Sequence, residues 1–190
     1  MTRWEPNARG RLQLAALELY SEHGYDQTTV AEIAKRAGLT ERTFFRYFAD
    51  KREVLFYGSG MLQERLVEGI VAAPEGMSPL DVVGASLEAA AEPVEEIRDF
   101  SRRRQAVVAA NPELRERELT KLAALATALT DTLRERGVAD PAATLVAEAG
   151  IAVFKVAYQR WVDRSDDSGE TLAQLIRQSL AELKTVTAAS

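Results

Sequence analysis

The apolar residues of this chain recur at intervals of three and four, the spacing that places side chains on one face of an α-helix. Near the start of the chain, one such stripe consists of Leu12, Ala15, Ala16, Leu19 and Tyr20. Near the end, another consists of Leu172, Leu175, Ile176, Leu180 and Leu183. Aromatic residues make up only 7% of the chain, fewer than a protein of many short strands requires. We therefore predict an all-α fold.

Helix starts are marked by residues that accept hydrogen bonds from the free N–H groups of the first turn. Thr29 stands three residues before Glu32, a pair that predicts a reciprocal capping box. Three later starts combine a capping residue with proline at the first helical position: Ser78-Pro79, Asn111-Pro112 and Asp140-Pro141. About nine helices are expected, over residues 7–22, 29–37, 40–48, 51–72, 79–91, 93–110, 112–136, 141–163 and 170–185.

The second and third expected helices are separated only by a short turn at Gly38, and Thr40 can cap the third. Two short helices joined in this way form a helix-turn-helix. Residues 1–52 carry nine basic against seven acidic residues, whereas the rest of the chain carries fifteen against twenty-two. Only the first segment therefore has the positive charge that favours nucleic acid. We expect a three-helix DNA-binding domain over residues 1–50 and a second helical domain over residues 51–190.

Other protein classes lack their sequence signatures here. The chain contains no cysteine, which leaves no disulfide and no thiolate nucleophile. No run approaches the ~18 apolar residues of a membrane span, so we expect a cytoplasmic protein. The only histidine is His23, and the chain has neither a phosphate-binding glycine loop nor an H-E-x-x-H motif. We expect no enzymatic activity, no metal site and no cofactor.

Residues 28–51 read TTVAEIAKRAGLTERTFFRYFADK. The paired threonines, the I-A-x-x-A-G turn, the T-x-x-T-F-F-R-Y-F segment and the downstream lysine resemble the DNA-binding motif of TetR-family transcriptional regulators. The upstream A-A-L-E-L-Y-S-E-H-G-Y resembles the first helix of that family, so the resemblance covers about residues 8–56. It implies a homodimer that binds a palindromic operator as a repressor and is released by a small-molecule ligand. The alternative is an accessory helix-turn-helix protein without an inducer.

The residues that we expect at the DNA are Thr29, Thr40, Arg42, Thr43, Phe45, Arg46, Tyr47 and Lys51. Hydroxyl groups and the lysine ammonium suit phosphates, which position a protein on the duplex without reading its sequence. Arg42 lies in the first turn of the recognition helix, where a guanidinium can bind a guanine edge with two hydrogen bonds. Arg46 can reach a base or a phosphate. The alternative for both arginines is a solvated pair bonded to Glu41 and Asp50.

Phe45 stands out because helical spacing places it opposite Phe44 and Phe48, which share the inward face. An apolar ring on the outer face calls for a cover, and a thymine methyl group or a sugar edge would provide one. The alternative is that Phe45 packs against the first or the fourth helix. The TetR family often has tyrosine at this position, so this chain lacks a hydroxyl group there.

The larger domain is expected, from the resemblance, to bind a ligand and to form the dimer. Apolar, aromatic and basic side chains that can line a pocket are Met61, Phe100, Arg103, Phe154 and Tyr158. Arg103 belongs to a run of three arginines, residues 102–104, which point in different directions on a helix and can equally form a solvated face. For the dimer interface the expected residues are Phe154, Trp161, Leu172, Leu175, Ile176 and Leu180. The alternative is that the pocket and interface residues fill the core of one chain.

Overall fold

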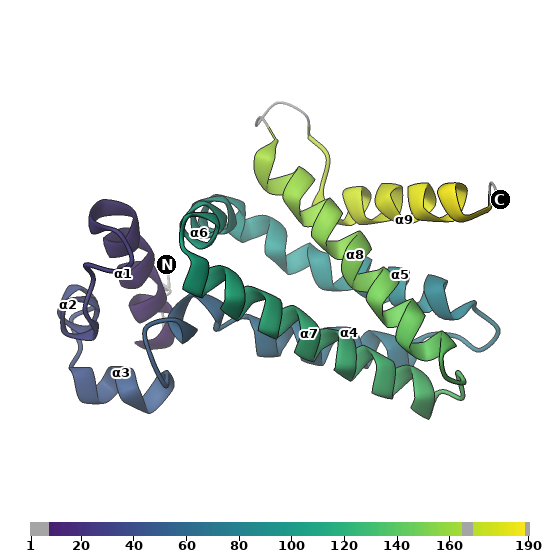
Figure 1. Ribbon diagram of the computed structural model, residues 1–190, viewed down its shortest axis with the longest axis horizontal. Helices are drawn as coiled ribbons and strands as arrows, with labels where there is room; N and C mark the ends of the chain where they lie inside the picture. Colours follow the sequence, from purple (N-terminus) through teal and green to yellow (C-terminus); the bar gives the residue numbers. More distant parts are fainter. Residues whose placement is uncertain (1–7, 165–168, 189–190) are drawn as a thin grey trace, which may run out of the picture. The chain divides into compact units, whose positions relative to one another are not determined.

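The computed structural model describes residues 8–164 and 169–188, which contain helices and no strand (Figure 1). The helices are α1 (Ala8–His23), α2 (Val30–Arg36), α3 (Glu41–Tyr47), α4 (Ser59–Ala72), α5 (Pro79–Ala91), α6 (Arg98–Ala110), α7 (Pro112–Glu135), α8 (Ala142–Asp163) and α9 (Leu172–Ala188). Two short 3-10 helices, η1 (Glu53–Phe56) and η2 (Glu92–Ile97), precede α4 and α6. The predicted all-α fold is confirmed. In the described ranges, no helix has the length and apolar character needed to cross a membrane.

The chain forms two compact units. The first contains residues up to Ser59 together with Arg103–Leu119, and the second contains Gly60–Arg102 and the residues from Thr120 onward. These units do not coincide with the expected division at residues 50/51, because the end of α6 and the start of α7 belong to the first unit.

The core of the first unit is built from the stripes that the sequence predicts. All five residues of the α1 stripe are buried, and Ile33 of α2 and Phe44 of α3 are completely covered. Gly38 adopts a positive φ of 65° in the turn between α2 and α3, a conformation that favours glycine. The Arg11 guanidinium donates to the carbonyl groups of Ala37 and Gly38, so α1 holds this turn in place.

Arginines and a tyrosine attach the α6–α7 corner to the rest of the first unit. Arg104 donates to the carbonyl oxygen of Leu55 at 2.8 Å and forms an ion pair with Glu118 at 3.1 Å. Its guanidinium also lies 4.7 Å from the centre of the Phe56 ring. The Tyr25 hydroxyl donates to Glu113 at 3.3 Å. These contacts explain why residues beyond 100 group with the helix-turn-helix.

Two of the expected helices are interrupted. The expected helix 51–72 begins with the 3-10 helix η1, and α4 starts only at Ser59, between Gly58 and Gly60. Two glycines so close together carry a high conformational cost in a helix, which favours a break there. The expected helix 93–110 likewise starts as η2, and α6 follows from Arg98.

The Asp50 carboxylate precedes η1 and binds the backbone at its start. Its carboxylate accepts from the backbone N–H groups of Arg52 at 2.8 Å and Glu53 at 3.2 Å, and from the Arg52 side chain. Burial favours a higher pKa for Asp50, but these hydrogen bonds outweigh it and hold the pKa below its usual value.

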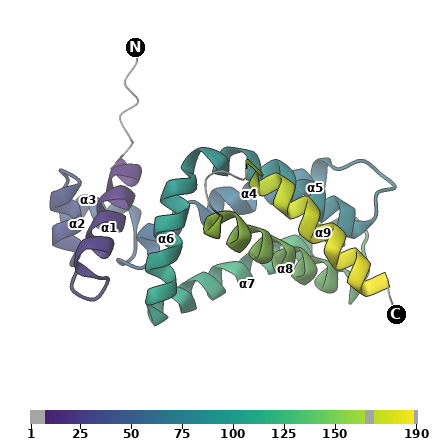
Figure 2. The same ribbon diagram turned by 90° about the horizontal axis from the view of Figure 1, so that it is seen from above.

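In the second unit, α5 lies against α4, α8 and α9 at unusually short range (Figure 1 and Figure 2). A Cβ atom on Gly69 of α4 would lie 2.5 Å from the Ser86 hydroxyl and 3.2 Å from the Ser86 Cα. Gly150 of α8 leaves room for Val83 in the same way, and Gly84 leaves room for Leu180. Glycine therefore lets three helices approach α5 closely.

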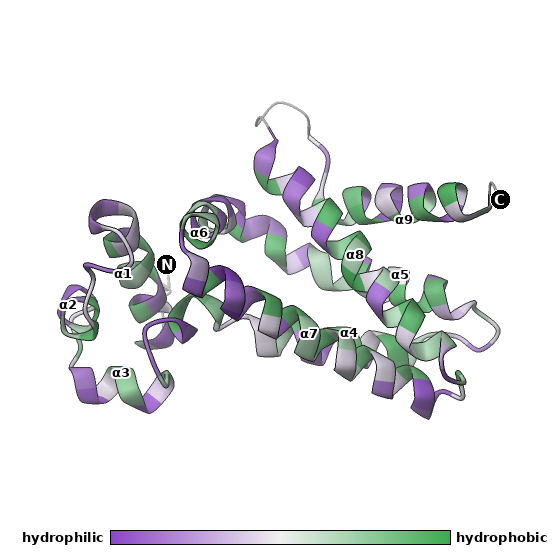
Figure 3. Ribbon diagram, viewed as in Figure 1, coloured by the Kyte–Doolittle hydropathy of each residue, from purple (hydrophilic) through white to green (hydrophobic). Residues whose placement is uncertain are grey.

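The stripe on α9 packs inside this unit, which corrects the expected dimer interface. The residues that lie in the core of the chain itself are Trp161, Leu172, Leu175, Ile176 and Leu180. Phe154 is partly buried against the same core. Glu95 of η2 accepts hydrogen bonds from the Trp161 indole at 3.1 Å and from the Leu172 backbone N–H, which joins η2 to α8 and α9. Apolar and polar residues recur along α9 (Figure 3), and α5 and α8 cover its apolar stripe.

Candidate DNA-binding interface

The helix-turn-helix is set by two threonine caps. The Thr29 hydroxyl accepts from the Glu32 N–H at 3.2 Å, and the Glu32 carboxylate accepts from the Thr29 N–H at 2.8 Å, which confirms the capping box. The hydrogen bonds that the Glu32 carboxylate accepts from the Thr29 N–H and from the Thr29 hydroxyl lower the pKa of Glu32. Thr40 accepts from the Thr43 N–H at 3.2 Å, and the two hydroxyl groups lie 3.0 Å apart. Both short helices therefore start where the sequence predicts, although each hydroxyl already has a partner within the chain.

The outer face of α3 is exposed and basic. Phe44 and Phe48 are buried beneath it, whereas Arg42 and Arg46 are exposed. Among the described residues, Arg42 has no hydrogen-bond or ion-pair partner, so the alternative of a pair with Glu41 or Asp50 is wrong for this side chain. Asp50 pairs instead with Arg52, at 2.7 Å. A free guanidinium in the first turn of α3 is available to a guanine edge.

Phe45 lies on the same face and is 55% exposed. Its ring meets only the edge of the neighbouring Phe44 ring, at 5.4 Å between centroids, among the ring contacts of the described residues. The alternative in which Phe45 packs against the first or fourth helix is therefore wrong. A large exposed ring next to a free arginine is the kind of apolar surface that suits a thymine methyl group.

Tyr47 and Arg46 lie together at the end of α3. Arg46 donates to the Tyr47 hydroxyl at 2.8 Å, and its guanidinium lies 4.7 Å from the centre of the Tyr47 ring. A third residue, Arg9 of α1, lies over the same ring at 5.1 Å. The sequence analysis missed Arg9, because nothing in the spacing along the chain connects it with a residue 38 positions later.

Lys51 has a different role from the expected one. Its ammonium donates to the carbonyl groups of Tyr25 at 2.9 Å, Thr28 at 3.1 Å and Asp26 at 3.4 Å, and lies 4.3 Å from the Tyr25 ring centre. An ammonium has three donors, and all three are used here. Lys51 therefore stabilises the loop between α1 and α2 and offers no free donor to a phosphate, which corrects the prediction.

Comparison with known proteins supports the DNA-binding interpretation. Residues 14–57 match the model of the bacterial regulatory proteins of the tetR family, and residues 77–188 match that of the MftR C-terminal domain. The chain belongs to the TetR family. This membership confirms a DNA-binding transcriptional regulator and not an enzyme, as the sequence predicts.

Three relatives illustrate the extent of the similarity. The transcriptional regulator TcmR of Streptomyces glaucescens is 36% identical over 81 residues, which span 43% of this chain and about a third, 36%, of TcmR. A protein of Mycobacterium tuberculosis named as the mycofactocin biosynthesis transcriptional regulator MftR is 28% identical over 153 residues, 77% of this chain and 76% of its own. The crystal structure of the TetR-family repressor FadR of Thermus thermophilus, in complex with lauroyl-CoA, aligns over 93% of each chain with 28% identity and a TM-score of 0.54.

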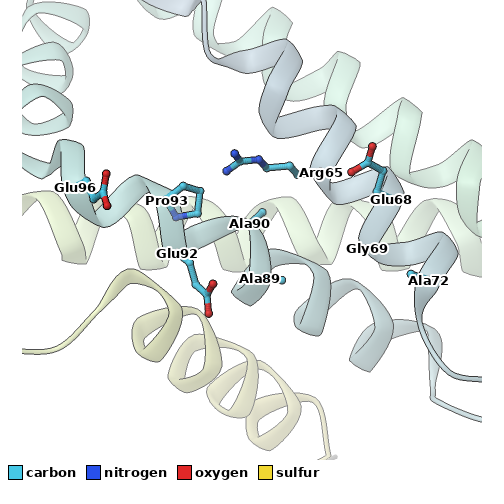
Figure 4. Close-up of a pocket in the computed structure, with 9 residues that line it drawn as sticks. All are labelled: Arg65, Glu68, Gly69, Ala72, Ala89, Ala90, Glu92, Pro93 and Glu96. Carbon is cyan, nitrogen blue, oxygen red and sulfur yellow. The ribbon is translucent and has the colours of Figure 1, made fainter. Parts of the chain in front are cut away.

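The second unit of this TetR-family chain contains a groove of about 680 Å³ between α4 and the end of α5 (Figure 4). Its lining consists of Arg65, Glu68, Gly69, Ala72, Ala89, Ala90, Glu92, Pro93 and Glu96. Figure 4 shows the Arg65 side chain extending from α4 toward Pro93. Glycine, alanine and proline residues line the apolar part of the groove. The charged groups in its lining are three glutamate carboxylates and one arginine guanidinium.

None of the expected pocket residues lines this groove. Met61 and Arg103 are exposed, and Phe100 is half-buried. The tilted rings of Phe154 and Tyr158 contact each other at 5.7 Å between centroids and pack against the core. These two rings therefore fit the alternative, a place against the core of the chain, better than a place in a ligand pocket.

Proposed function

We propose that this TetR-family regulator represses transcription in the cytoplasm, binds an inverted-repeat operator as a homodimer, and is released by a small-molecule effector. The observation that carries the proposal is the outer face of α3, where the unpartnered Arg42 and the exposed Phe45 lie above the buried Phe44. The outer face of α3 reads bases, and its inner face anchors the helix in the core of the first unit. A dimer places two such helices in successive major grooves, about 34 Å apart.

The homodimer is proposed to form through the exposed face of α8, since the α9 stripe is occupied within the chain. Leu145 is 66% exposed and Val156 is 50% exposed, and they lie on one helix face with Ala149 and Ala152 between them. Small residues between two larger apolar ones let a second helix approach closely. A two-fold axis through this face pairs α8 with α8 of the partner subunit.

The effector is proposed to enter the groove between α4 and α5. Lauroyl-CoA is the first probe, because the relative FadR of Thermus thermophilus forms a complex with it. The carboxylates of Glu68, Glu92 and Glu96 repel the phosphates of coenzyme A, so an acyl thioester gains only through the apolar part of the groove. Replacing Glu92 with Gln should therefore strengthen binding of lauroyl-CoA.

The test starts with selection of duplexes from a random pool by the purified protein, followed by mobility-shift assays. The proposal predicts an inverted repeat bound by two protomers, weakened by Arg42→Ala and by Val156→Glu. Lys155→Glu is the matched control for Val156→Glu, because it also adds a carboxylate to α8 but outside the apolar face.

Effector release is tested on the selected operator with lauroyl-CoA, with free coenzyme A and with laurate. Release by a member of this panel supports the effector, and its location in the groove is checked with Glu92→Gln. If no compound in a wider ligand screen changes DNA affinity, the alternative of an accessory DNA-binding protein without an inducer replaces the repressor.

A further inference from the structure

The ring of Tyr47 contacts two arginines that come from different helices. The guanidinium of Arg9, on α1, is 5.1 Å from the centre of the Tyr47 ring, and that of Arg46, on α3, is 4.7 Å from it. Arg9 also lies 5.3 Å from the centre of the Tyr57 ring. All four residues belong to the first unit. The first turn of α1 is therefore joined to the end of the recognition helix by cation–π contacts.

The positive charge of this cluster is not neutralised. Neither arginine forms an ion pair within the described ranges, and Asp50, which follows α3 in the sequence, pairs with Arg52 and Arg117 instead. An aromatic ring attracts a guanidinium and fixes its position without cancelling its charge, whereas a carboxylate would cancel it. Two like charges against one ring repel each other, and an anion bound beside them offsets that cost.

The Tyr47 hydroxyl completes the set of polar groups. It accepts a hydrogen bond from Arg46 at 2.8 Å, which leaves the hydroxyl hydrogen free to donate. Two guanidinium groups and one hydroxyl donor match the oxygens of a phosphodiester. Because the cluster stands at the end of α3, the phosphate that suits it is one on the wall of the groove that α3 enters.

We propose that Arg9, held over the rings of Tyr47 and Tyr57, acts with Arg46 and Tyr47 to bind a backbone phosphate of the operator. This inference rests on the proposed function, and it adds α1 to the DNA-binding surface. Arg9 contributes affinity that is independent of sequence, whereas Arg42 contributes sequence preference. The tyrosine rings act as positioning groups because they fix a long side chain before DNA arrives.

The experiment measures DNA affinity over a salt series for the wild type and for Arg9→Gln, on the selected operator and on an unrelated duplex. Loss of one phosphate contact reduces the slope of log K against log salt by about 0.9. Because each protomer of the dimer loses one contact, the expected result is a slope shallower by about 1.8, with an affinity loss of about 25- to 100-fold at 0.1 M salt on both duplexes. Arg115→Gln, an exposed arginine of α7 in the same unit, is the matched control and should leave the slope unchanged.

A second variant separates charge from packing. Arg9→Lys keeps the charge and should restore most of the slope, whereas a residue that only ties α1 to α3 would lose affinity in Arg9→Gln without a change of slope. An Arg9→Gln slope equal to that of the wild type, with or without a loss of affinity, would overturn the inference. If the wild type binds no duplex at all, the proposed function fails instead, which is a separate outcome.

Discussion

Replacing Lys51 with Met tests whether this lysine stabilises the protein or binds DNA. The ammonium donates to the carbonyl groups of Tyr25, Asp26 and Thr28 at 2.9–3.4 Å. A hydrogen bond to a charged group contributes about 1.5–3 kcal/mol, and an exposed cation–π contact contributes about 0.5–1 kcal/mol. Water replaces part of this in the variant, because Lys51 is only half-buried. We expect the free energy of unfolding to fall by about 2–4 kcal/mol, less than the sum of these contributions.

Urea unfolding of Lys51→Met measures this loss, and Lys155→Met is the matched control because Lys155 is exposed on α8 without a partner among the described residues. The same variant, at a temperature where it is folded, should keep the wild-type salt slope of DNA binding. The reasoning is refuted if Lys51→Met unfolds like the wild type and its salt slope is shallower by about 1.8, which is the signature of one lost phosphate contact in each protomer of the dimer.

Three further predictions follow from the structure. Arg42→Ala should cost about 1–3 kcal/mol of operator binding and relax the preference at one base pair, measured by competition with single-base variants; an unchanged preference would place base reading elsewhere. Gly69→Ala should cost about 1–3 kcal/mol of stability and more than Gly84→Ala, because its Cβ meets the backbone of Ser86 whereas the other meets a flexible side-chain end; equal losses would contradict this. Because the pKa of Asp50 is lowered, the stability that this carboxylate provides is present at pH 7 and is lost as the pH falls below about 4. The difference in urea unfolding between Asp50→Asn and the wild type should therefore shrink steadily below that pH; a constant difference would contradict the assignment.

The sequence predicts best what depends on neighbouring residues. The α1 stripe, the inward Phe44 and the cap at Thr29 all follow from spacings of three and four, and the structure confirms them. The break before α4 was missed because the apolar positions after residue 51 continue at helical spacing across Gly58 and Gly60. Helix propensity is a local cost, and its outcome depends on packing that the sequence alone does not display.

Contacts between distant residues could not be predicted from one sequence. Lys51 matches the downstream lysine of the TetR motif, and for this reason we expected it at a phosphate. The carbonyl groups that bind its ammonium belong to residues 23 to 26 positions earlier in the chain. Arg9 is likewise joined to α3 only through the fold. The α9 stripe at Leu172 was known to need a cover, but whether α5 or a second subunit provides it depends on the tertiary arrangement.

The central claim is that α3 of a dimer reads DNA sequence. Its most direct test is the affinity of the purified wild-type protein for the selected duplex and for a permuted duplex of equal composition, measured at several salt concentrations. The account predicts at least about 10³-fold tighter binding to the selected duplex at physiological salt, in a complex of two protomers, with a steep decline as salt rises. Equal affinity for the two duplexes would contradict it.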